Sequence, residues 1–194
     1  MKKLLCLGTV GVVFLAVGVW LFVAGQGDAA QDAALKDGVL KIAATLKKGD
    51  SAAADNQAKS LAKKVEDLAD LMELFKKRDK GGIGVGLKAG VAVPDGIETK
   101  LVAMGRDAPA GSTLKKEAEA LEEMGYVVAA MAKVTKSRPI AKVKTKEWNT
   151  WCDDMATGGL KLSAAAKSQG AADLKAAATK INASCNSCHS TYRK

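Results

Sequence analysis

Residues 171–189 read AADLKAAATKINASCNSCH. Apolar positions in this stretch step alternately by four and three residues, at Leu174, Ala178, Ile181, Cys185 and Cys188. This spacing puts them on one face of an α-helix. We therefore predict an amphipathic helix near the C-terminus, with two cysteines at the end of its buried face.

Four earlier segments show the same helical period. Only 4% of the residues are aromatic, and the three prolines fall between the periodic segments. Together these features predict an all-α protein, an antiparallel four-helix-bundle type with one additional helix. The earlier stripes are Leu35, Val39, Ile42 and Leu46; Leu61, Val65, Leu68, Met72 and Phe75; Leu114, Ala118, Leu121, Met124, Val128 and Met131; and Trp148, Trp151, Met155, Leu162 and Ala166, interrupted by Gly158-Gly159.

The breaks between the stripes differ in length. Gly49-Asp50, with Ser51 as a helix start, and Gln169-Gly170 are short, so they predict helical hairpins. Residues 80–111 form a long, glycine-rich connection, in which we expect one helical turn near Ile97–Met104. A connection of this length is typical of a crossover from one end of a bundle to the other.

The C-terminal cysteines belong to the motif Cys185-Asn186-Ser187-Cys188-His189, a C-x-x-C-H sequence. This pattern is the signature of c-type haem attachment. Two thiols add across the two haem vinyl groups, and the following histidine supplies an imidazole ligand to the iron. On a helix, positions i, i+3 and i+4 share one face, so one turn presents both sulfurs and the ring nitrogen together.

Two other readings of the motif are weaker. A structural zinc site needs four ligands, and only Cys152 and carboxylates remain to complete one. A thioredoxin-like redox pair belongs beside a βαβ unit, of which the sequence shows no sign. One covalently attached haem c, with its iron, is the predicted cofactor.

The end of the chain resembles the class II cytochrome c family, the cytochrome c-prime type. Its C-x-x-C-H lies near the end of the last helix and is followed by Tyr192 and Arg193, and the resemblance covers residues 146–194. It implies a four-helix bundle with the haem at one end, close to Trp148. The family's sixth-ligand position lies on its first helix and has no clear counterpart here.

The N-terminus carries an export signal. Met1-Lys2-Lys3 precedes an uncharged apolar stretch from Leu4 to Ala24, which is typical of a secretory leader and also long enough for a membrane anchor. We predict residues 1–27 as signal peptide or anchor and residues 28–194 as the cytochrome domain. The protein is then periplasmic or otherwise extracytoplasmic, free or tethered to the inner membrane through residues 4–24.

The formal net charge is +9. Such a surface attracts acidic partners, and we expect an acidic docking surface on a redox partner protein. Nucleic acid is not expected, because the lysines are spread over solvent-facing helical positions without interleaved aromatic residues. A homodimer stays open.

Three functions are compatible with these features: one-electron transfer, gas binding at an open sixth iron position, and peroxidase chemistry. His189 is the only histidine, so a distal histidine for peroxidase chemistry is missing and we predict no enzymatic activity. The sixth ligand is a methionine, another group, or none. Met72 and Met124 are the first methionine candidates because both lie mid-stripe, and methionine is also a common filler of cores.

Overall fold

The computed structural model describes residues 24–140 and 143–192, which form helices joined by turns and loops and contain no strand. The helices are α1 (Ala24–Lys47), α2 (Ser51–Ala62), α3 (Leu68–Glu73), α4 (Ile97–Arg106), α5 (Gly111–Ser137), α6 (Thr145–Ser168) and α7 (Ala171–Tyr192), with a 3₁₀ turn η1 at Arg78–Lys80. The predicted all-α class is confirmed. None of these helices is long and apolar enough to cross a bilayer.

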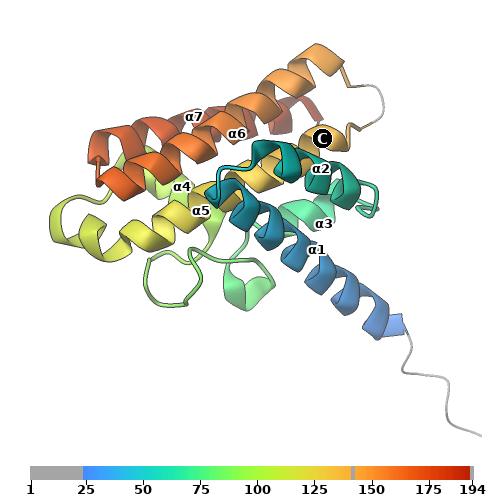
Figure 1. The fold of residues 1–194 in the computed structure, drawn as a ribbon, viewed down its shortest axis with the longest axis horizontal. Helices are drawn as coiled ribbons and strands as arrows, with labels where there is room; N and C mark the ends of the chain where they lie inside the picture. The colour runs from blue at the N-terminus through green and yellow to red at the C-terminus, as the bar shows by residue number, and fades with distance from the viewer. Residues whose placement is uncertain (1–23, 141–142, 193–194) are drawn as a thin grey trace, which may run out of the picture.

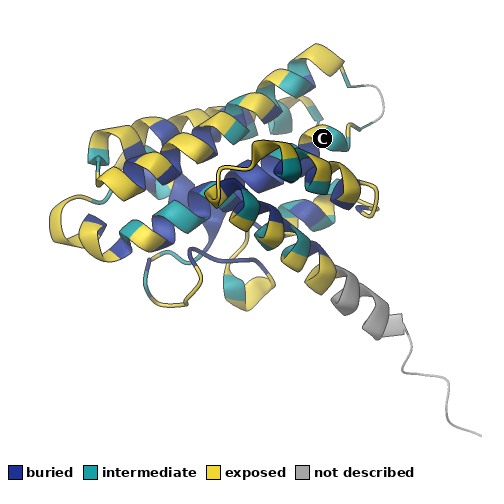
Figure 2. Ribbon diagram, viewed as in Figure 1, coloured by how far each residue is buried: buried dark blue, intermediate teal, exposed yellow. Residues whose placement is uncertain are grey.

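The long helices α5, α6 and α7 lie side by side, with α6 and α7 forming the C-terminal hairpin (Figure 1). Helix α4 packs on α7, while α1 and α2 pack on each other and on α5. Figure 2 shows that much of α5 is buried in the middle of the molecule. The arrangement is consistent with a four-helix-bundle type fold to which further helices are added.

Both predicted hairpin turns are present. The Asp50 carboxylate caps α2 by accepting a hydrogen bond from the Ala53 N–H, at 2.9 Å, which satisfies one of the free donors at the start of a helix. In the second turn the left-handed residue is Gln169, with φ 56°, rather than the glycine that follows it. The Gly170 N–H closes this turn on the Ala165 carbonyl.

The second stripe, predicted from Leu61 to Phe75 as one helix, is broken in the structure. Helix α2 ends at Ala62, and Asp67 caps the start of the separate helix α3. The guanidinium of Arg138, just after α5, donates to the carbonyls of Val65 and Glu66. The break persists because Arg138 satisfies these two carbonyls.

The fourth stripe, which Gly158-Gly159 interrupts, forms one continuous helix, α6. A Cβ added at Gly159 would lie 2.6 Å from the Gly125 carbonyl oxygen and 2.7 Å from the Ala129 nitrogen of α5. Glycine here lets the backbones of α5 and α6 approach closely.

The connection predicted over residues 80–111 contains more helix than the single turn expected. Helix α4 has ten residues and buries Ile97, Leu101 and Met104. A buried ion pair attaches it to α5: the Lys100 Nζ lies 2.7 Å from the Glu117 carboxylate and 2.9 Å from the Val93 carbonyl oxygen. At the other end of the chain, α1 begins at Ala24, so the predicted boundary after residue 27 falls inside this helix; residues 1–23 lie outside the described part.

Candidate haem-attachment site

Helix α7 carries the complete C-x-x-C-H motif in its last turns. Cys185, Cys188 and His189 are each half-buried. Because the segment is helical, the two sulfurs and the imidazole belong to one face, as predicted. The motif thus lies where a bound group would be shielded on one side and close to solvent on the other.

The two thiols lie against apolar surroundings. Cys185 packs against the hydrophobic core. Burial, followed by the neighbouring Cys188 and Glu98, raises the pKa of the Cys185 thiol to about 11. Burial also raises the pKa of the Cys188 thiol. Burial therefore favours the neutral thiol at both cysteines.

The start of α6 lies beside the end of α7. The ring of Tyr192 meets Trp148 edge-on at a centroid distance of 6.3 Å and Trp151 at 5.9 Å. Directly before the motif, the Ser184 hydroxyl donates to the Trp151 carbonyl at 2.6 Å. Trp148 is therefore beside the end of α7, where the family resemblance places it.

Helix α4 runs along the other side of α7. The Asn182 side chain donates to the Leu101 carbonyl at 2.9 Å, and the carboxylate of Glu98 is close enough to raise the pKa of Cys185. The Glu98 N–H in turn donates to the carbonyl of Phe75, which follows α3. The motif end of α7 is thus bordered by α6, α4 and the segment after α3.

The two candidate methionine ligands occupy different places. Met72 is half-buried in α3, three residues before Phe75, which belongs to the segment that borders the motif. Met124 is fully buried at the middle of α5, where the next residue, Gly125, faces Ser163. It lies twelve residues, or about 18 Å, along α5 from Lys136, which pairs with Asp153 at the motif end. Met124 therefore packs away from the motif and fills the core.

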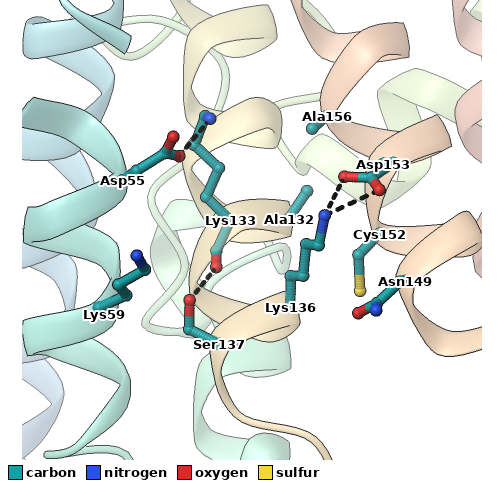
Figure 3. Close-up of a pocket in the computed structure, with 10 residues that line it drawn as sticks. All are labelled: Asp55, Lys59, Ala132, Lys133, Lys136, Ser137, Asn149, Cys152, Asp153 and Ala156. Atoms are coloured by element: carbon teal, nitrogen blue, oxygen red, sulfur yellow. Dashed lines mark hydrogen bonds and ion pairs between the residues drawn. The ribbon is translucent and has the colours of Figure 1, made fainter. Parts of the chain in front are cut away.

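A groove of about 580 Å³ lies between α2, α5 and α6 (Figure 3). Two ion pairs flank it, Lys133 with Asp55 and Lys136 with Asp153, and the buried Cys152 thiol borders it. Burial, followed by the nearby Cys188, raises the pKa of Cys152 to about 12. The sequence did not predict that this third thiol lies near Cys188. Its spacing of four residues from Trp148 places both side chains on one face of α6 and could have indicated it.

Two buried polar atoms at this end have no hydrogen-bond partner: the Trp148 Nε1 and the Thr135 Oγ1. They are the only such side-chain atoms in residues 32–140 and 143–192. Thr135 is the neighbour of Lys136 in α5. Because Lys136 pairs with Asp153 of α6, Thr135 and Cys152 lie at the same height along the two helices. Buried donors normally have acceptors, so this end of the bundle fits a bound group that carries oxygen acceptors. Within the same residues, no three His, Cys, Asp or Glu side chains are grouped to hold a metal ion.

A helical bundle whose last helix ends in a half-buried C-x-x-C-H has the architecture of a bundle-type c-type cytochrome. The family model described as cytochrome c′ matches residues 112–193, which comprise α5, α6 and α7. This match confirms the resemblance to class II cytochromes c, and with it covalently attached haem c and its iron as the cofactor. No curated protein and no solved structure matches the chain.

Proposed function

We propose that the protein is a one-electron carrier whose single haem is attached through Cys185 and Cys188, with His189 as an axial iron ligand. The observation that supports this most directly is the position of the motif. All three residues are half-buried at one end of the bundle, so an iron bound there is close to the surface across which a partner exchanges electrons.

The residues of the site have distinct tasks in this proposal. Each thiol adds across one vinyl group, so that a carbon–sulfur bond forms and the thiol hydrogen passes to the other vinyl carbon. The haem then supplies a one-electron iron couple. The aromatic wall of Trp148, Trp151 and Tyr192 excludes water from one side, and low solvent exposure is one of the factors that set the potential of a haem.

An acidic redox partner fits the charge at this end. Exposed lysines follow one another at the end of α2, at Lys59, Lys63 and Lys64, and Lys146 is exposed at the start of α6. Lysines around the motif would speed encounter with an acidic surface, and the rate would fall with ionic strength. Charge reversal of Lys63 and Lys146 should slow electron exchange at low salt more than at high salt.

Gas binding at an open sixth position is the second candidate, and two observations favour it. His189 is the only histidine, and Met124 packs away from the motif. Met72, three residues before Phe75, is the remaining first-choice methionine. A thioether ligand favours ferrous iron and electron transfer, whereas an empty position favours binding of carbon monoxide or nitric oxide.

Absorption spectra in both oxidation states, with and without carbon monoxide, separate the two functions. Electron transfer through a six-coordinate iron predicts a low-spin spectrum that carbon monoxide changes slowly. A methionine-to-iron charge-transfer band, lost in Met72→Ala and retained in Met124→Ala, would assign the ligand. A high-spin spectrum that is the same in both variants and shifts readily with carbon monoxide would replace electron transfer by gas binding.

Attachment and export are tested on the same preparation. Intact mass and haem-stained denaturing gels should show one haem. Cys185→Ala and Cys188→Ala should each leave at most one thioether, and stain lost on acid-acetone extraction would contradict covalent attachment. We propose an extracytoplasmic location, since cytochromes c′ are typically periplasmic. Release of the protein by osmotic shock would indicate a cleaved leader, and a need for detergent would indicate a membrane anchor. Holoprotein in the cytosol would contradict both.

A further inference from the structure

Trp148 and Trp151 form a natural comparison at the end of α6. Both rings meet Tyr192 edge-on, but Trp151 is half-exposed whereas Trp148 is only 3% exposed. The Trp148 Nε1 is fully buried and has no acceptor. An indole N–H can only donate, and burying it without an acceptor is unfavourable. Its burial therefore points to an acceptor that comes from outside the polypeptide.

The neighbours of the Trp148 ring place it close to the motif. Tyr192, which contacts the Trp148 ring, lies three residues after His189 on the same helix. The second unpartnered atom, Thr135 Oγ1, comes from α5 at the same end of the bundle. Helices α5 and α6 thus each leave one buried polar side-chain atom without a partner at this end of the bundle.

Covalent haem brings few acceptors to such a site. Its macrocycle is hydrocarbon at the rim, its pyrrole nitrogens bind the iron, and its vinyl groups are consumed by the two thiols. The remaining polar groups are the two propionate carboxylates, which form strong charge-assisted hydrogen bonds. We propose that the Trp148 indole N–H donates to one haem propionate and so fixes the orientation of the haem edge against α6. Trp148 is then a positioning residue, and the proposal rests on haem attachment as proposed above.

The test uses holoprotein in which the propionate carboxyl carbons are labelled with ¹³C through labelled δ-aminolaevulinate. Infrared difference spectra between the oxidised and reduced forms then identify the propionate bands by their isotope shift. In Trp148→Phe, which keeps an aromatic ring and removes the donor, a carboxylate band should move relative to the unaltered protein. In Trp151→Phe, which makes the same change in the other ring that meets Tyr192, the bands should stay in place.

Each outcome decides the matter. Unchanged propionate bands in Trp148→Phe would overturn the proposal and leave a buried water as the acceptor, and equal shifts in both variants would show a general loss of packing. If Trp148→Phe gives no holoprotein, ultraviolet resonance Raman spectra of the unaltered protein replace it: one strongly hydrogen-bonded indole is expected, and a non-bonded buried indole overturns the proposal. Absence of haem from the unaltered protein would instead defeat the proposed function.

Discussion

Gly159→Ala tests the close approach of α5 and α6. The added methyl carbon would lie 2.6 Å from the Gly125 carbonyl oxygen and 2.7 Å from the Ala129 nitrogen. Ordinary contacts at such positions begin at 3.4 Å, so the helices must separate locally by about 0.8 Å, which is the difference between 3.4 and 2.6 Å. Both opposing atoms belong to the backbone, so no side-chain rotation can relieve the clash.

The expected magnitude combines two opposing effects. Overpacking of a core costs about 1–3 kcal/mol, while replacing a helical glycine by alanine gains about 1 kcal/mol. Since the clash is with backbone, we expect the upper part of that cost and a net loss of about 1–2 kcal/mol. For a domain of this size this lowers Tm by about 2–8 °C.

Thermal unfolding of the holoprotein, followed by circular dichroism, measures the loss. Gly158→Ala is the matched control, because its methyl would meet the Ile181 Cγ1 at 2.6 Å, a side-chain atom that can move. Gly158→Ala should be closer to neutral, since propensity offsets a smaller strain. A Gly159→Ala protein as stable as the unaltered one, or more stable than Gly158→Ala, would refute the close-packing argument.

Two further predictions concern buried ionisable groups. Lys100→Met should destabilise the protein by about 3–5 kcal/mol, because it leaves the Glu117 carboxylate buried without its cation. In denaturant titrations, the double variant Lys100→Met/Glu117→Leu should recover most of this loss of stability. Additive losses from the two substitutions would contradict the pairing. Cys152, with its pKa raised to about 12 by burial, should resist alkylation at pH 8 in the folded state. The same shift predicts that stability falls as pH rises from about 9 toward 12, because only the unfolded thiol ionises in that interval; rapid labelling of folded protein at pH 8 would refute the burial.

Local sequence signals predicted the helix that carries the motif. The step of four and three residues that ends at Cys185 and Cys188 follows from helix geometry alone, and Asp50 is a cap that depends on the next three residues. Such features can be predicted because the residues that form them are close to one another in the sequence.

Features that depend on distant partners could not be predicted in this way. The stripe from Leu61 to Phe75 has helical spacing, yet it breaks where Arg138, 73 residues later, binds the Val65 carbonyl. Gly159 interrupts an apolar stripe in the sequence, and its role in the close approach of α5 depends on Gly125 and Ala129 across from it. In both segments, only the contacts with distant parts of the chain show whether the helix breaks or continues.

The hydrogen bond between Arg138 and Val65 has a consequence for the order of folding. Helices α5, α6 and α7 are consecutive and touch their neighbours in sequence, whereas the contacts of Arg138 with Val65 and of Asn182 with Leu101 span 73 and 81 residues. Closing such long loops is slower than zipping adjacent helices together. We therefore expect the three C-terminal helices to assemble first and the N-terminal half to dock afterwards. The two cysteines of α7 then stay open to haem delivery until α4 and the segment after α3 close over that end.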